Sequence, residues 1–249
     1  MTYAARITKT NARCGECPIR HRAVCAYCEP PELVTLDAIK SYKTYAAGET
    51  IAWAGEKAQV IGSVVSGVAT LSRTLPDGRR QMVGLLLPSD FVGRPGREST
   101  PYDVVAVNEV TLCQFSKSQF EKLVATTSTL ERRLLDMTMD ELDAAREWML
   151  LLGRKTAREK IASLLAIMAR RDAALNMQTV KNGLRFVLPL TREAMADYLG
   201  LTIETVSRQI SALKKSGVII LEDARHVVVP DYAVLLDEAG DDSDGGMIS

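Results

Sequence analysis

The sequence has no long hydrophobic run. Its longest uncharged apolar-rich stretch, Val60 to Leu71, is interrupted by glycines and serines, whereas a membrane-spanning helix needs about 20 apolar residues. The first ten residues also lack the apolar segment of a secretion signal. We therefore expect a cytoplasmic protein with no membrane partner.

Histidine is scarce, and the familiar catalytic motifs are missing. The 249 residues include two histidines, His21 and His226. There is no GxxxxGK phosphate loop, no HExxH zinc motif and no GxSxG nucleophile motif. The many acidic residues belong to the faces of predicted helices. The sequence therefore gives no reason to expect an enzyme.

The chain has no net charge, because 31 basic residues balance 31 acidic ones. The balance is uneven along the sequence, however. Residues 154–230 carry 13 basic and 7 acidic side chains, and residues 231–249 carry six acidic and no basic ones. A basic segment followed by an acidic tail indicates either a polyanionic partner or an uneven distribution of solvated charge.

Five cysteines are present, and four of them crowd the polar N-terminal segment. In a reducing cytosol, cysteines are more often ligands or redox groups than disulfides. Four thiolates suit either an iron–sulfur cluster or zinc. A set that includes Cys113, on a predicted strand, would join the N-terminal loop to a rigid element. The alternative zinc set stays within the loop and consists of Cys14, Cys17, Cys25 and Cys28.

Short apolar runs separated by glycines fill residues 33–127. The sequence Pro76-Asp77-Gly78 is a hairpin turn, since proline presets one φ angle and glycine supplies a positive one. Many short strands with regular turns are typical of a β-sandwich or barrel. The predicted strands are Thr50–Trp53, Val60–Val65, Val68–Leu75, Gln81–Leu87, Val104–Val107 and Val110–Phe115.

A proline-free stretch, residues 128–172, predicts one long helix with an interruption near Gly153. Its apolar stripe is narrow and flanked by charged residues, which favours a two-stranded coiled coil and hence a homodimer. The alternative is a helix that lies on its own domain. One seam of the stripe contains Leu135, Leu142 and Met149, and the other contains Thr138, Ala145 and Leu152.

A helix-turn-helix pattern follows. Thr191 can cap a helix that ends at Gly200, and Thr202 can cap a second helix, Ile203 to Lys215. Two alternating runs, Val218–Leu221 and His226–Val229, then predict a β-hairpin. A helix-turn-helix followed by a hairpin is a winged helix.

The second helix has the chemistry of a DNA reader. It would bury Val206, Ile210 and Leu213. On its other face, Arg208 can donate two hydrogen bonds to guanine, Glu204 can accept one from cytosine, and Ser207 can do either. Lys214 and Lys215, near the end of the helix, suit phosphates. In this setting we expect double-stranded DNA as a partner rather than an ordinary solvated face.

Two stretches resemble the cyclic-AMP receptor protein superfamily of transcription regulators. Residues 48–56, GETIAWAGE, are similar to its opening β-roll repeat, and residues 199–208, LGLTIETVSR, are similar to the recognition region of its fumarate–nitrate regulator branch. The resemblance spans about residues 14–230, leaves the acidic tail outside, and is closest to the FnrL-type anaerobic regulators.

The resemblance implies an α+β fold with a jelly-roll-like β-roll, a dimerisation helix and a C-terminal winged helix-turn-helix. The expected parts are a cysteine-rich segment (1–32), the β-roll sensor domain (33–127), the dimerisation helix (128–153), the DNA-binding domain (154–230) and an acidic tail (231–249).

The resemblance also implies an oxygen sensor that activates transcription. A 4Fe–4S cluster would be held by Cys14, Cys17, Cys25 and Cys113. It would promote dimerisation and binding to palindromic TTGAT-type sites without oxygen, and oxygen would destroy it. The β-roll loop Asp77–Arg80 would contact RNA polymerase.

The same resemblance raises cyclic nucleotides as a rival ligand. Nucleotide-binding β-rolls carry a glutamate where this sequence has Arg94. That departure argues against a nucleotide, which remains an alternative together with zinc.

Overall fold

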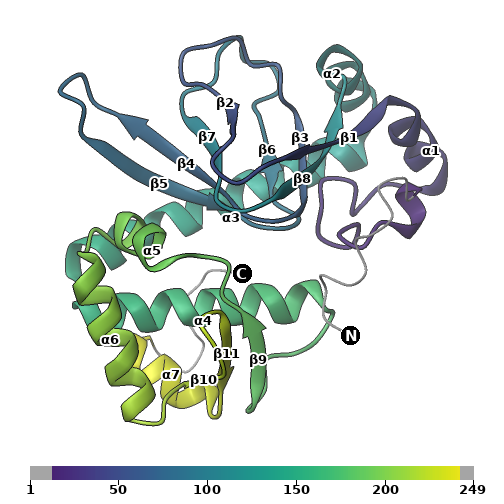
Figure 1. Cartoon of the computed structure of the whole chain (residues 1–249). Helices are drawn as coiled ribbons and strands as arrows, with labels where there is room; N and C mark the ends of the chain where they lie inside the picture. Colours follow the sequence, from purple (N-terminus) through teal and green to yellow (C-terminus); the bar gives the residue numbers. More distant parts are fainter. Residues whose placement is uncertain (1–12, 242–249) are drawn as a thin grey trace. The chain divides into compact units, whose positions relative to one another are not determined.

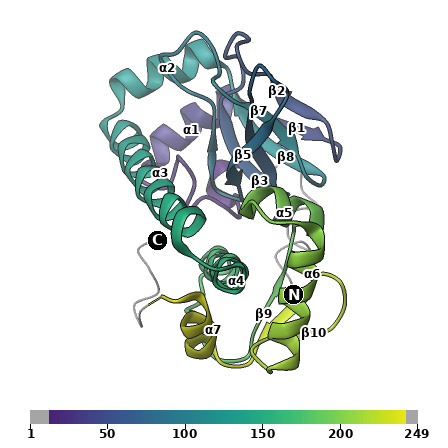
Figure 2. The ribbon, with the colours of Figure 1, turned by 90° about the vertical axis from the view of Figure 1, so that its left-hand side faces the viewer.

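One long helix, α3 (Ser128–Arg154), belongs to two structural units. The computed structural model describes residues 13–241, and the chain divides after Met139 into an N-terminal and a C-terminal unit (Figures 1 and 2). None of the helices in this range is long and apolar enough to cross a membrane.

The N-terminal unit is built on a sandwich of two four-stranded antiparallel sheets. Buried aliphatic side chains such as Ile51, Val64, Val104 and Leu112 fill the space between them. The expected β-roll is therefore confirmed. The first sheet has the order β1 (Lys40–Tyr45), β8 (Val110–Phe115), β3 (Gly62–Ser66), β6 (Phe91–Val92), and the second has β2 (Thr50–Ala52), β7 (Asp103–Ala106), β4 (Ala69–Thr74), β5 (Arg80–Leu86).

The segment expected to be β-structure also contains two helices, which the sequence analysis missed. Helix α1 (Pro30–Ile39) begins after Glu29, which forms a capping box with Glu32, and helix α2 (Lys117–Thr126) follows β8. The two helices contact each other (Figure 1). Ahead of α1, Cys14–Glu16 forms a short 3-10 turn, η2.

The predicted break near Gly153 is present. Helix α3 ends at Arg154, and Thr156 begins α4 (Ala157–Leu175) by accepting a hydrogen bond from the Glu159 N–H. The two helices differ in burial. Nine residues of α4 are buried, whereas on α3 the side chains of Leu135, Leu142 and Met149 are 59%, 43% and 65% exposed. These three side chains of the predicted dimer seam are therefore exposed to solvent in a single chain.

The C-terminal unit contains the predicted winged helix, with helices α5 (Arg192–Leu199) and α6 (Ile203–Lys215). Its three-stranded sheet has the order β10 (Ile220–Leu221), β11 (His226–Val229), β9 (Leu184–Val187). The predicted hairpin thus gains β9 as a third strand.

The expected boundary at residue 231 needs correction. Residues Tyr232–Ala239, counted as acidic tail, form helix α7, which packs on α4. Its Leu235 and Leu236 are buried, and Arg158 of α4 pairs with Glu238 at 2.5 Å. The apolar residues between the acidic ones make this segment part of the folded unit.

Candidate metal centre and nucleic-acid interface

The N-terminal loop that carries four of the cysteines folds back on itself through short-range hydrogen bonds. The Ala23 N–H donates to the Ile19 carbonyl at 2.9 Å, and the Cys28 N–H donates to the Cys25 carbonyl at 3.2 Å. Ile19, Ala23 and Val24 of this loop are each buried. All five cysteines are free thiols; Cys17 is half-buried and the other four are buried.

Cys113 is held by a rigid frame. It lies on β8, between β1 and β3, opposite Tyr42 on one side and Ser63 on the other. At Gly62 of β3, a β-carbon would collide with the Cys113 carbonyl. The absence of a side chain at this position lets the two strands lie close together, so the position of Cys113 is fixed by two flanking strands.

The thiols influence one another electrostatically. Burial raises the pKa of Cys113, and the neighbouring Cys17, Cys14 and Cys25 raise it further. Burial likewise raises the pKa of Cys25 to about 12, with contributions from Cys17, Cys14 and Cys28. The pKa of the strand thiol therefore depends on the charge state of the loop thiols.

Cys28 has different surroundings. Burial raises its pKa to about 11, Glu32 raises it further, and a hydrogen bond with Thr129 of α3 lowers it. It is not among the described groups that raise the pKa of Cys113. Cys14, Cys17 and Cys25 thus act electrostatically on Cys113, whereas Cys28 acts on Cys25 and forms its hydrogen bond with Thr129 of α3.

Lys40 supplies a positive charge beside the thiols, which the sequence analysis did not identify. Its Nζ lies 3.7 Å from the Cys14 Sγ and 2.5 Å from Asp37 Oδ1. Asp37 Oδ1 also accepts a hydrogen bond from the Cys14 N–H at 2.9 Å. The Lys40 side chain is 9% exposed, so solvent screens it little. Its charge can offset thiolate charge at this place.

A single metal ion and an iron–sulfur cluster require different spacings of their ligands. Among residues 13–241, no group of three or more His, Cys, Asp or Glu side chains is placed to hold a metal ion. Four thiolates on one zinc lie about 3.8 Å apart, as follows from tetrahedral Zn–S bonds of about 2.3 Å. A cluster of four irons separates its thiolates more widely. Four sulfur ligands on two structural elements, three of them buried and Cys17 half-buried, suit such a cluster.

Helix α6 presents the predicted base-reading residues to solvent. Thr202 caps the helix by accepting from the Thr205 N–H at 3.2 Å, and Gly200 ends α5 in the left-handed conformation, with φ of +63°. Val206, Ile210 and Leu213 are buried, as predicted. Glu204, Ser207 and Arg208 are exposed, and the Arg208 guanidinium donates to the Thr205 hydroxyl at 3.2 Å.

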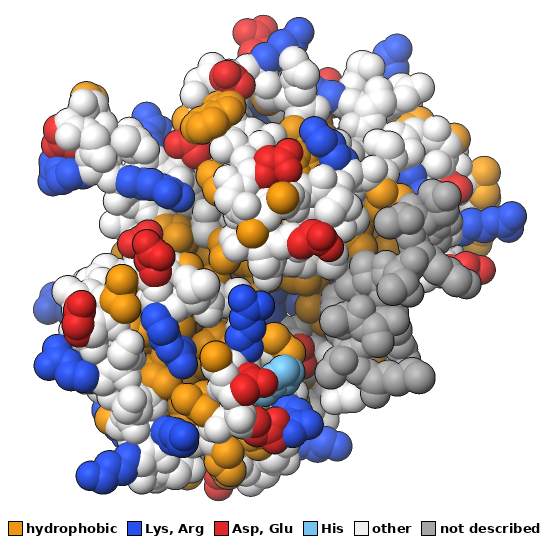
Figure 3. Space-filling view, in the orientation of Figure 1, with side chains coloured by type: hydrophobic (Ala, Val, Ile, Leu, Met, Phe, Trp, Pro, Cys, Tyr) orange, Lys and Arg blue, Asp and Glu red, His pale blue; other side chains and the backbone are white. Residues whose placement is uncertain are grey.

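Basic side chains lie on and near this helix. Lys214 and Lys215 lie exposed in its last turn, and Figure 3 shows Lys and Arg side chains over the region of α6. This basic surface suits a phosphate backbone.

A ring stack that the sequence analysis missed joins α3 to the helix-turn-helix. The centroids of the Trp148 and Tyr198 rings lie 3.8 Å apart.

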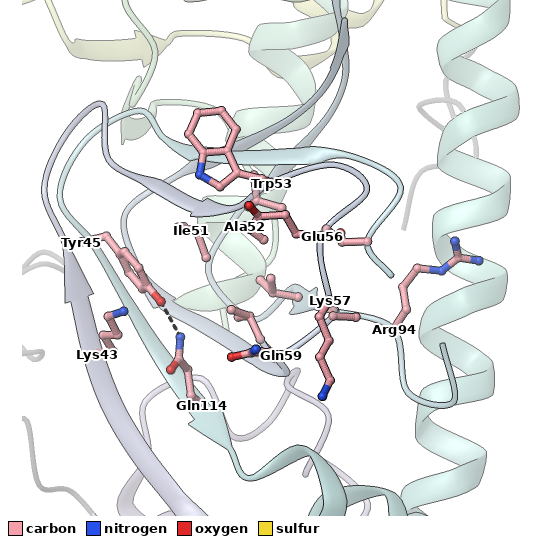
Figure 4. A pocket seen from close by; sticks show the side chains of 16 residues that line it. Lys43, Tyr45, Ile51, Ala52, Trp53, Glu56, Lys57, Gln59, Arg94 and Gln114 are labelled. Atoms are coloured by element: carbon pink, nitrogen blue, oxygen red, sulfur yellow. Dashed lines mark hydrogen bonds between the residues drawn. The ribbon is translucent and has the colours of Figure 1, made fainter. Parts of the chain in front are cut away.

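A cavity of about 590 Å³ opens in the β-sandwich (Figure 4). Its lining includes Lys43, Lys57 and Arg94. Inside the cavity, the Gln114 side-chain amide donates a hydrogen bond to the Tyr45 hydroxyl at 2.7 Å, so these two polar groups are paired. Figure 4 shows the Arg94 guanidinium turned away from the other labelled side chains.

Comparisons with known proteins agree with this architecture. The sequence model of the cyclic nucleotide-binding domain matches residues 42–127, and that of the Crp-like helix-turn-helix domain matches residues 159–238. The chain is 65% identical to "Transcriptional activator protein FnrL" of Cereibacter sphaeroides, over 94% of this chain and 95% of that protein. It is 38% identical to "Nitrogen fixation regulation protein FixK" of Bradyrhizobium diazoefficiens, over 84% of this chain and 86% of that one.

A solved structure is similar over the same range. The structure of FixK2 from Bradyrhizobium japonicum is 34% identical, with a TM-score of 0.71, and the match covers 80% of this chain and 96% of that one. With matches to both domain families and a close relative along nearly its full length, the chain belongs to the cyclic-AMP receptor protein/fumarate–nitrate regulator (CRP/FNR) family.

Proposed function

We propose that this protein is an oxygen-sensing transcription activator that binds DNA as a homodimer while a 4Fe–4S cluster is held by Cys14, Cys17, Cys25 and Cys113. The observation that carries the proposal is the grouping of the thiols. Cys14, Cys17 and Cys25 raise the pKa of Cys113 on its fixed strand, whereas Cys28 contributes to the pKa of Cys25 but not to that of Cys113. The named activator relative at 65% identity supports the regulatory role.

The residues of the chain have distinct roles in this mechanism. An iron–sulfur cluster, when bound, supplies oxygen-labile bonds to the four thiolates. The cysteines then hold the loop against β8, and the uncovered α3 seam pairs with a second copy. The two α6 helices of the dimer enter successive major grooves, about 34 Å apart. There Arg208, Glu204 and Ser207 read the bases of TTGAT-type half-sites.

The exposed turn between β4 and β5 is the proposed contact with RNA polymerase. Arg79 and Asp77 form an ion pair of 2.8 Å within it, and both side chains are more than half exposed. A turn ordered by its own hydrogen bonds can present charged groups to a partner at little entropic cost.

Single cysteine substitutions test the proposal. Anaerobically purified Cys14→Ala, Cys17→Ala, Cys25→Ala and Cys113→Ala proteins should lose the visible absorption, the iron and sulfide, and tight DNA binding. Cys28→Ala is the matched control and should keep all three. A Cys113→Ala protein with full iron content and oxygen-sensitive DNA binding would contradict the ligand assignment.

The same samples distinguish the alternatives. A colourless protein with one zinc, lost in Cys28→Ala and kept in Cys113→Ala, would support the zinc site. DNA binding that required added cyclic AMP, in the presence or absence of oxygen, would support a nucleotide in the β-roll cavity instead.

A further inference from the structure

The first turns of α3 contact the cysteine loop directly. The Arg133 guanidinium donates from Nη2 to the Arg22 carbonyl at 2.5 Å and from Nε to the Ala23 carbonyl at 3.3 Å. It also lies over the Tyr27 ring, 5.4 Å from the ring centre. These three loop residues all lie between Cys17 and Cys28. One side chain of α3 therefore holds the loop at three places.

A second contact lies one turn earlier on the same face of α3. The Thr129 hydroxyl donates to Glu32 Oε2 at 2.8 Å and forms a hydrogen bond with the Cys28 thiol. Leu130, between the two polar contacts, is fully buried. Residues three and four apart share one helix face, so Thr129, Leu130 and Arg133 lie on one face of α3, and two of them contact α1 and the loop.

The bare apolar stripe lies on the other side of the same helix. Leu135, Met139 and Leu142 are 59%, 55% and 43% exposed. At 3.6 residues per turn, Leu135 points about 200° away from Arg133. The helix thus has the cysteine loop on one face and the predicted dimer seam on the opposite face.

We propose that Arg133 is the positioning residue that couples the order of the cysteine loop to α3 and hence to the dimer seam. The carbonyls of Arg22 and Ala23 are available to Arg133 only while the turns hold, because those turns depend on hydrogen bonds from Arg22 N–H to Ile19 and from Ala26 N–H to Ala23. When the loop opens, the guanidinium loses both acceptors. The first turns of α3 then lose their support.

This inference rests on the proposed function for one step, the ordering of the loop by the cluster. The contact itself can be tested in metal-free protein. There, native-state alkylation of Cys25 by N-ethylmaleimide, followed by mass spectrometry, should be about 10-fold faster in Arg133→Met, because charge-assisted hydrogen bonds that hold the loop closed are lost. The matched control is Arg132→Met, which removes the same charge from an exposed neighbouring position.

The coupling is tested in anaerobic, iron-loaded protein. Arg133→Met should keep the visible absorption of the parent, but its dimer dissociation constant should rise toward that of the metal-free parent. Arg133→Lys should recover part of the dimer affinity, since an ammonium group can still donate to these carbonyls. Circular dichroism and thermal unfolding identify a variant that fails to fold, in which case Arg133→Lys against Arg132→Lys replaces the comparison.

The outcomes separate the two proposals. Unchanged Cys25 alkylation in Arg133→Met would overturn the contact, and faster alkylation with parental dimerisation would overturn the coupling. A parent protein that binds no iron would refute the proposed function, whereas the alkylation comparison would still decide whether Arg133 holds the loop.

Discussion

Replacing Leu142 on α3 should weaken the dimer by an amount that its exposure allows us to estimate. Full burial of a leucine side chain contributes about 1.5–3 kcal/mol, and 43% of Leu142 remains exposed in one chain. Dimer formation can therefore gain roughly 1 kcal/mol from each Leu142, or about 2 kcal/mol from the pair. Leu142→Ala should raise the dimer dissociation constant about 30-fold.

Leu142→Asp should have a larger effect, because it would bring two unpaired carboxylates into the seam. Removing charges from water without partners costs several kcal/mol, so the protein should be monomeric at micromolar concentration even without oxygen. The measurement is anaerobic sedimentation velocity. Leu75→Asp is a matched control, since Leu75 is similarly exposed, at 46%, but lies in the turn between β4 and β5.

The fold of each chain should survive both substitutions, because neither leucine is buried in its own chain. Circular dichroism should therefore be unchanged while sedimentation distinguishes the two proteins. An intact Leu142→Asp dimer would refute the assignment of this stripe as the interface. Equal weakening by Leu142→Asp and Leu75→Asp would show that added charge, and not the seam, governs assembly.

The other predictions concern the winged helix. Arg208→Ala should weaken DNA binding by about 1–3 kcal/mol and relax the sequence preference at one base pair. An unchanged ranking of half-site variants by affinity would contradict direct reading by Arg208. Lys214→Ala should weaken all sites alike and lower the salt slope by about one, measured by titration at several salt concentrations. The wing turn should be acid-sensitive: N–H groups of Arg225 and His226 and the imidazole lower the pKa of Asp223 to about 2. These hydrogen bonds stabilise the turn above the unfolded pKa of Asp223, about 3.9, and the stabilisation is lost as the pH falls through its folded pKa of about 2. Amide exchange at Arg225 and His226 measures this loss, and Asp223→Asn should remove the pH dependence.

Local chemistry made the recognition region predictable. Thr191 and Thr202 accept hydrogen bonds from the N–H groups three residues later, and Gly200 adopts the left-handed conformation that ends α5. Each of these features depends on residues within one helical turn. The predicted bounds of α6 therefore agree with the structure.

Features that depend on distant partners were missed. Strand β9 is stabilised by pairing with β11, about 40 residues later in the chain, and α7 is stabilised by packing on α4. The acidic residues of α7 suggested a solvated tail, because Leu235 and Leu236 are recognisable as core residues only once α7 packs on α4. Lys40 and Arg133 likewise have no distinguishing sequence pattern, since each is defined by what the fold places beside it.

The two faces of α3 bear on how far a signal from the cysteine loop must travel. Arg133 contacts the loop, and Leu142 lies nine residues further along the same helix, a rise of about 13 Å. A route through β8 would instead begin at Cys113, which its flanking strands hold in place. Strand β8 is paired on both sides, whereas the start of α3 is held by hydrogen bonds to the loop. In the proposed mechanism, the contact through Arg133 is therefore the direct link between the cysteine loop and the α3 stripe proposed as the dimer seam.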